Sequence, residues 1–224
     1  MDTQKALSWA FFWVSLSAIF SGYLYVAFGA QTALTYLACY GVEKMLSLDN
    51  LLMFYVIFKY FEVLPSKQRI ALNIGIISSF ILRGLMIFSG GFLVNKYHWL
   101  SYVFGTFLVY SAGGLLLQKD EENEPKSVIN FVGKWMPWLS MFGVVIATIE
   151  LTDVLFALDS IPASFGVTSN PLIIYTSNIF SILGLRSLHF VILDVIERFA
   201  YLDKIIAVIL GCVGIKMIVQ TYLG

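Results

Sequence analysis

Five carboxylates interrupt stretches of the sequence that are otherwise strongly apolar. They are Glu43, Asp49, Glu150, Asp153 and Asp159. An acid at the centre of a bilayer costs about 2.5–3.5 kcal/mol even on the gentler insertion scale, so such groups face a bundle interior rather than lipid. If these stretches cross a membrane, we expect their carboxylates to meet away from lipid and to bind a cation.

Three basic residues in the same apolar stretches, Lys44, Arg83 and Arg186, can neutralise part of that charge. Five acids less three bases leave about two negative charges, which match one divalent cation or two protons. The alternative is that these groups form buried ion pairs that only fix how the helices pack. Buried pairs are poor sources of stability compared with apolar packing, whereas ionisable residues in membranes more often mark binding sites or pathways.

Helical spacing arranges the oxygen donors in two stripes. One stripe carries Glu43, Ser47 and Asn50, and the other carries Glu150, Asp153 and Ser160. Asp49 and Asp159 lie about a third of a turn from their stripes. If the stripes face each other, their oxygens can form a cage of about six ligands, with Asn178 as a further amide donor.

The ligand types indicate a hard divalent ion. Every donor in these stripes is an oxygen, which suits Mg²⁺, Ca²⁺ or Mn²⁺ rather than Zn²⁺ or Cu⁺. His98 and His189 lie outside the pattern. We also expect Pro162 and Gly166 to end or break the helix close to Asp159, which would free backbone carbonyls as ligands.

The composition identifies the elements that must position these groups. Of the 224 residues, 59% are hydrophobic and 12% are charged, about half the charge of an ordinary soluble domain. A span needs about 20 mostly apolar residues and must be helical. The sequence predicts an all-α bundle of about seven transmembrane helices, at approximately 9–29, 32–58, 70–95, 98–117, 138–162, 171–196 and 202–223.

Two halves of this bundle resemble each other. Glu43 and Asp153 are each followed six residues later by an aspartate and a small polar residue. The next span of each half carries an arginine near its centre, and the span after that contains glycines. We expect one membrane domain built from an inverted repeat of three helices plus three, over about 32–117 and 138–223.

Basic residues in the short loops predict the orientation. One side carries Lys5, Lys59, Lys67, Arg69, Lys119, Lys126, Lys134, Arg198 and Lys204, whereas the other carries Lys96 and Lys216. The excess predicts that the N-terminus lies inside. The first apolar run is too long for a typical signal peptide and is expected to be retained.

Three segments resemble the signatures of the TerC family of membrane proteins. They are residues 41–51 (GVEKMLSLDNL), 150–163 (ELTDVLFALDSIPA) and 175–188 (YTSNIFSILGLRSL). The family is named for tellurium resistance, several members are linked to manganese export, and it is grouped with LysE-type exporters. The chain is expected to lack a helix that many members carry ahead of the first span, and to have a shorter loop between its fourth and fifth spans.

This resemblance implies Mn²⁺ efflux across a bacterial inner membrane and places Glu43, Asp49, Asn50, Glu150, Asp153 and Asp159 in the family's acidic site. We expect Ser160 to complete the ion's shell and Arg83, Arg186 and Asn178 to support it. Mn²⁺ is then a substrate, with Ca²⁺ and Mg²⁺ as alternatives, and the chain is not an enzyme.

Two other functional classes remain alternatives. One is an accessory membrane protein that delivers metal or takes part in tellurite or metal stress resistance without transport, and the other is a purely structural membrane protein. The formal net charge of zero gives no electrostatic basis for nucleic-acid binding. Cys39 and Cys212 lie in apolar stretches without metal-ligand spacing and are expected to be structural thiols.

Overall fold

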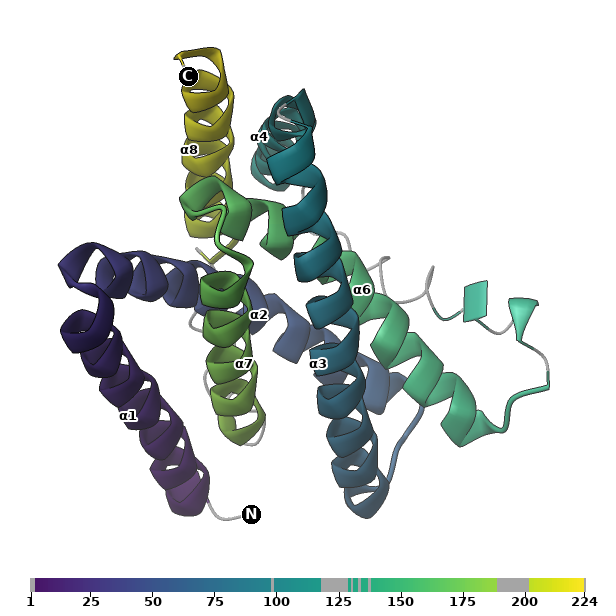
Figure 1. The fold of residues 1–224 in the computed structure, drawn as a ribbon. Coiled ribbons are helices and arrows are strands. Elements are labelled where there is room, and N and C mark those ends of the chain that lie inside the picture. Colours follow the sequence, from purple (N-terminus) through teal and green to yellow (C-terminus); the bar gives the residue numbers. More distant parts are fainter. Residues whose placement is uncertain are drawn as a thin grey trace.

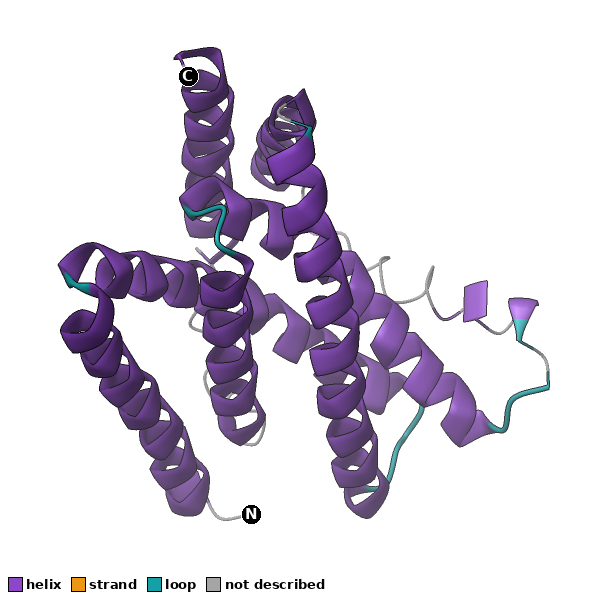
Figure 2. Ribbon diagram, viewed as in Figure 1, coloured by secondary structure: helices purple, strands orange, loops and turns teal. Residues whose placement is uncertain are grey.

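The described part of the chain consists of helices joined by short loops. The computed structural model describes residues 3–97, 99–117, 129, 131–132, 134–136, 138–188 and 202–223. Its long helices are α1 (Thr3–Phe28), α2 (Ala30–Tyr60), α3 (Pro65–Lys96), α4 (Trp99–Leu117), α6 (Met141–Val167), α7 (Pro171–Leu188) and α8 (Leu202–Leu223). Figure 2 shows no strand among these residues. The all-α fold is therefore confirmed, and each expected span overlaps one of these helices.

Local sequence signals explain where several helices begin. Gly29 has a φ of 88°, a left-handed conformation that glycine adopts without a Cβ penalty, and it separates α1 from α2. Pro65 occupies the first turn of α3, where its missing N–H costs nothing. Ser140 precedes α6, and its hydroxyl accepts a hydrogen bond from the backbone N–H of Gly143 at 3.2 Å.

The prediction that Pro162 ends or breaks its helix near Asp159 is wrong. Helix α6 runs without interruption to Val167 and holds Pro162 inside it. A proline within a helix removes one backbone hydrogen bond, which membrane helices tolerate when their neighbours compensate. The backbone of α6 therefore stays helical around Asp159, and Gly166 lies at the end of the helix rather than at a break.

The surface of the bundle is apolar and its interior contains charge. Long or bulky apolar side chains such as Phe11, Val26 and Ile81 are exposed, while Glu43 and Arg83 are buried. This is the reverse of a soluble fold and is what a lipid environment requires. Among the described residues, three segments are long and apolar enough to cross a membrane, Ser8–Phe28, Pro65–Lys96 and Met141–Val167, with shorter apolar helices at Pro171–Gly184 and Ala207–Leu223.

Helices at equivalent places in the two expected repeats contact each other. Helix α2 packs on α6, α3 on α7, and α4 on α8, and α1 lies against α2 and α7 (Figure 1). An inverted repeat would place these same pairs across its axis. The repeat itself stays a prediction, because the internal symmetry of the fold is not measured by these contacts.

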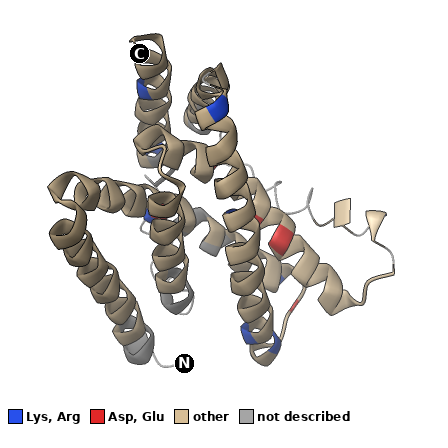
Figure 3. Ribbon diagram, in the orientation of Figure 1, with Lys and Arg blue, Asp and Glu red and all other residues tan. Residues whose placement is uncertain are grey.

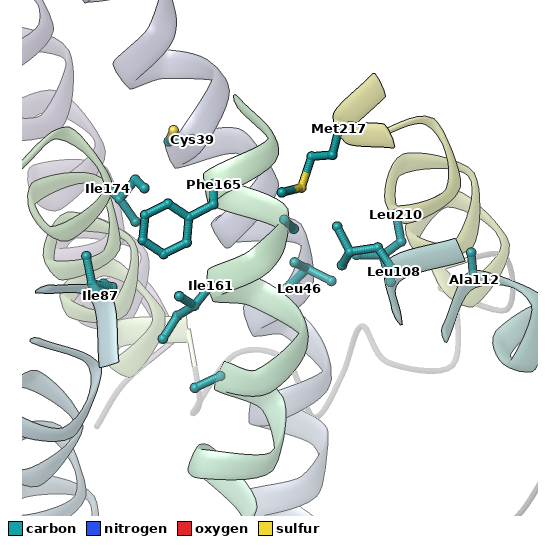
Figure 4. Packing of buried hydrophobic residues seen from close by; sticks show 12 residues of the cluster. Cys39, Leu46, Ile87, Leu108, Ala112, Ile161, Phe165, Ile174, Leu210 and Met217 are labelled. Carbon is teal, nitrogen blue, oxygen red and sulfur yellow. The ribbon is translucent and has the colours of Figure 1, made fainter. Parts of the chain in front are cut away.

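Apolar side chains fill the space where the two halves meet. Figure 4 shows Phe165 of α6 with Ile87 and Ile174 on one side, and Leu108 and Leu210 between α4 and α8 on the other. These side chains are almost fully buried. Because lipid is as apolar as they are, their contribution comes from close packing rather than from escape from water.

Helices α4 and α8 cross at a contact between two glycines. A Cβ added to Gly105 would lie 2.9 Å from the carbonyl oxygen of Gly214, and one added to Gly214 would lie 2.7 Å from that of Gly105. Small residues at such crossings allow two backbones to approach closely. The contact is reciprocal, so neither glycine can be enlarged without moving the partner helix.

We predict that Gly214→Ala destabilises the protein, by about 1–3 kcal/mol, because the new methyl group meets backbone rather than a flexible side chain. Thermal unfolding in detergent measures this change. Gly113→Ala is the matched control on α4, since a Cβ there has no neighbour within 4 Å. Equal midpoints for the two variants would contradict the close crossing.

Candidate ion site in the bundle interior

A single arginine joins the two halves of the molecule. Arg83, which is 1% exposed, pairs through Nη1 with Glu43 of α2, whose side chain is also fully buried. Its Nη2 pairs with Asp153 of α6, 3.0 Å from Oδ1. The guanidinium thus lies between carboxylates from the first and second expected repeats.

The amide of Asn178 on α7 completes this pairing. Its Oδ1 accepts a hydrogen bond from Arg83 Nη1 at 2.7 Å, and its Nδ2 donates to Glu43 Oε2 at 3.1 Å. The amide therefore bridges the base and the acid. The network now includes side chains from α2, α3, α6 and α7, and Figure 3 shows the acidic segment of α6 lying beside α3.

Hydroxyl and amide groups satisfy the remaining carboxylate oxygens. Ser79 Oγ donates to Asp153 Oδ2 at 2.8 Å, and Asn50 Nδ2 lies 3.4 Å from Asp153 Oδ1. Ser47 Oγ lies 3.3 Å from Glu43 Oε1. The Oδ1 atom of Asn50 is buried without a hydrogen-bond partner among the described residues, which leaves one oxygen donor free for a ligand.

The helical spacing of these residues accounts for their convergence. Glu43, Ser47 and Asn50 lie at i, i+4 and i+7 on α2, so their side chains leave the same face. Ser79 and Arg83 are one turn apart on α3. When these faces of α2 and α3 point toward α6, their polar side chains meet Asp153.

Two other predicted ligands lie in separate hydrogen bonds. Glu150 Oε1 accepts from Ser78 of α3, while its Oε2 is buried without a partner among the described residues. Asp159 Oδ1 accepts from Ser111 of α4 at 3.0 Å. Neither carboxylate contacts Arg83, so these two acids extend the polar interior along α6 in both directions from Asp153.

The remaining candidates are placed only in part. Ser160 is 1% exposed and its hydroxyl has no hydrogen-bond partner in the described structure. The side chains of Asp49 and Arg186, and the whole of His98 and His189, lie outside the described residues. The backbone at Asp49 and Arg186 is helical, as expected.

Lys44 does not join the carboxylates in the described structure. Its ammonium lies against α7, where it donates to the carbonyl oxygen of Ser181 at 3.2 Å. A Cβ added to Gly184 would lie 2.6 Å from Lys44 Nζ, so the absence of a side chain at Gly184 makes room for this group. Lys44 is therefore held by backbone, although the sequence suggested it as a third partner for the acids.

Sequence reasoning missed the serines that hold the acids. Ser78, Ser79 and Ser111 each donate to a carboxylate. One signal was present, because Ser79 lies one turn before Arg83 and must share its face. Ser111 had no such signal, since its role depends on how α4 packs against α6.

The donor set suits a hard cation, but Arg83 occupies the position between its carboxylates. No three Asp, Glu, His or Cys side chains form a metal-type cluster in the described part of the chain. Oxygen atoms of Asn50 and Glu150 are buried without partners, so part of a ligand shell is available near Asp153. Ser160, which is also unpartnered, lies about 10 Å beyond Asp153 along the unbroken α6, so the expected six-ligand cage that includes both Asp153 and Ser160 around one ion does not form in this arrangement.

Comparison with known proteins identifies the family. The profile described as the integral membrane protein TerC family matches residues 28–223. The chain belongs to the TerC family. It is 38% identical to an uncharacterized membrane protein of Myxococcus xanthus over 96% of this chain and 73% of that one. No solved structure is significantly similar.

Two further relatives of this TerC protein have comparable coverage. It is 35% identical to a protein of Escherichia coli strain K12 named as a candidate membrane-bound redox modulator, Alx, over 99% of this chain and 78% of that one. It is 33% identical to an uncharacterized membrane protein of Rickettsia bellii, over all of this chain and 81% of that one. These relatives support an integral membrane protein.

We predict that Arg83→Gln destabilises the protein by about 3–5 kcal/mol, because it leaves Glu43 and Asp153 buried without their cation. The midpoint of thermal unfolding in detergent measures the effect. Arg69→Gln is the control, because Arg69 is an exposed arginine in the second turn of α3, and this variant should unfold like the wild type. A wild-type midpoint for Arg83→Gln would show that the pair carries no net stabilisation.

Proposed function

We propose that this TerC protein transports a divalent metal ion, and that Mn²⁺ efflux is its function. The observation that supports this most directly is the meeting of Glu43 and Asp153, from different halves of the chain, in one buried network around Arg83. Two carboxylates buried side by side need a positive counter-charge. The same need selects a cation as the substrate.

Charge balance supports a divalent ion. The guanidinium of Arg83 neutralises one of the two carboxylates. Glu43, Asp153 and Arg83 together therefore carry a net charge of −1. A divalent ion between Glu43 and Asp153 would neutralise both. In this proposal Arg83 withdraws when the ion enters and returns when it leaves, so the carboxylates are never left without a counter-charge.

The proposed ion shell draws on both expected repeats. Asn50 provides an uncharged oxygen that has no partner in the described structure, and Asp49 and Glu150 supply further carboxylates near Asp153. Because α6 is unbroken, Asp159 and Ser160 lie about 9–10 Å along the helix axis from Asp153 and would serve the ion at a second position rather than in the same shell. Arg186 and Asn178 support the site. Because the donors are all oxygens, Mn²⁺ competes at this site with Ca²⁺ and Mg²⁺ rather than with Zn²⁺.

The proposed orientation follows from the loop charges, and the proposed direction from the family resemblance. The basic residues predict that the N-terminus lies inside. Because several TerC members are linked to manganese export, we propose that Mn²⁺ moves outward across a bacterial inner membrane. Alternating access is supported by the arrangement of paired helices, since inverted repeats expose a central site to one side at a time. Tellurium resistance remains a phenotype of the family name rather than a substrate.

A second candidate function follows from the completeness of the network. Arg83, Asn178 and Ser79 satisfy Glu43 and Asp153 from within the chain. A network of this kind also suits an accessory membrane protein that binds metal for delivery, or serves in metal stress, without moving ions. Such a protein would bind Mn²⁺ but would not transport it.

Flux of Mn²⁺ into liposomes containing the purified protein separates these functions. We predict that Glu43→Gln, Asp49→Asn, Asp153→Asn and Asp159→Asn each lower the flux about tenfold or more, because each removes a charged ligand worth at least about 1.4 kcal/mol. Glu62→Gln is the control, since Glu62 is an exposed acid in the loop between α2 and α3.

Binding of Mn²⁺ is measured on the same samples by the loss of its free electron paramagnetic resonance signal. Binding without flux in the wild type would support the accessory function. Neither binding nor flux would support a purely structural network and would reject the proposal.

A further inference from the structure

A cavity with a mixed polar and apolar lining lies at one end of the bundle, where α3, α6 and α8 end and α4 begins. It has a volume of about 590 Å³. Its polar side chains are Asn95, Ser101, Thr168, Ser169, Gln220 and Thr221. All of them present uncharged amide or hydroxyl groups, and no carboxylate of the described residues lines the cavity. We call this cavity the vestibule.

Two buried serines on α6 lie between the vestibule and Asp153. Ser160 is 1% exposed and Ser164 is 0% exposed, and neither hydroxyl has a hydrogen-bond partner among the described residues. A buried polar group without a partner costs about 1–3 kcal/mol, and such groups in native proteins are commonly satisfied by water or an ion. Both hydroxyls therefore indicate a hydrated interior at this depth.

Two other buried hydroxyls in the bundle form hydrogen bonds within their own helices. Ser177 Oγ donates to the carbonyl oxygen of Ile174 at 2.8 Å, and Thr148 Oγ1 donates to that of Val144 at 2.8 Å. This local bond to the preceding turn is the usual way for a buried serine or threonine to be satisfied within a helix. Ser160 and Ser164 do not make it, and Ser181 on α7 is a third buried serine whose hydroxyl has no partner among the described residues. What singles out Ser160 and Ser164 is their place on one helix beside Asp153.

The two serines share the face of α6 that carries Asp153. Ser160 follows Asp153 by seven residues and Ser164 by eleven, which places all three within about 40° around the helix. The steps along the helix axis are about 10 Å and about 6 Å. Immediately after Ser164, the segment from Phe165 to Ser169 lines the vestibule. The polar face thus leads from the carboxylate network to the vestibule.

The ring of Phe165 lies between the vestibule and a second, apolar cavity. Phe165 lines both the vestibule and an apolar cavity of about 410 Å³ between α3, α4 and α6. Its ring fits against Gly90 and Gly91, where added Cβ atoms would lie 3.1 Å and 3.6 Å from ring carbons, and it stacks on Phe104. Phe165 therefore lies between the vestibule and the apolar cavity.

We propose that the Ser160–Ser164 face of α6 is a hydrated path along which a divalent cation moves between the carboxylate network and the vestibule. This rests on the proposed function and adds the side on which the site opens. Uncharged oxygens can replace part of an ion's water shell without holding it tightly, which is what a path requires.

Substituted cysteines test the path without relying on ion flux. The background is Cys212→Ala, because Cys212 is an exposed free thiol whereas Cys39 is buried. Into it we place Ser164→Cys on the path, Ser177→Cys as an equally buried control, and Ser169→Cys at the mouth as the reactive reference. A small, positively charged, membrane-impermeant methanethiosulfonate is added to liposome-embedded protein, and labelling is followed by intact mass.

We expect Ser164→Cys to react at least tenfold faster than Ser177→Cys, from the same side of the membrane as Ser169→Cys, and to be slowed by Mn²⁺. Equal protection of Ser164→Cys and Ser177→Cys would overturn the path. If Ser164→Cys fails to fold, judged by gel filtration, Ser160→Cys gives the same comparison. If Ser164→Cys is labelled but the protein shows no Mn²⁺ flux, the hydrated path stands and the proposed transport function is rejected.

Discussion

The ion pairs of Arg83 with Glu43 and Asp153 constrain which faces of the helices point into the bundle. In a medium of low dielectric, a carboxylate without a counter-charge costs several kcal/mol, so the helices that carry these groups must meet. The bundle satisfies that constraint with one guanidinium held between α2, α3 and α6 and one amide from α7. The apolar packing around it contributes the remaining contacts, but it does not by itself select which helix faces turn inward.

The sequence predicted the helices well because bilayer thickness and backbone hydrogen bonding leave few alternatives. The seven expected spans each overlap a helix, and the spacing of Glu43 and Asn50 correctly placed their side chains on one face. The predicted break at Pro162 does not occur, because proline breaks helices in water but is tolerated within a packed membrane helix. The error followed from applying a local rule where neighbouring helices decide the outcome.

Contacts within the site could be predicted only where they share a helix. That Arg83 and Ser79 of α3 reach the same carboxylate, Asp153, follows from their spacing of four residues. The role of Asn178 in bridging Arg83 and Glu43 depends instead on how α7 lies against α2 and α3. The same limit explains Ser111, whose bond to Asp159 requires the packing of α4 on α6. The periodicity of a single sequence indicates which residues share a face of a helix, but not which neighbouring helix that face contacts.

The reciprocal glycine crossing of α4 and α8 has a mechanical consequence. Two backbones in contact at Gly105 and Gly214 cannot slide past each other easily, so the motion that preserves the crossing is a tilt about it. Ser101 lies on the vestibule side of this fulcrum, and Ser111, which holds Asp159, lies on the other side. A tilt of α4 therefore moves the mouth of the vestibule and the partner of an acidic side chain in opposite senses, as the two arms of a lever do.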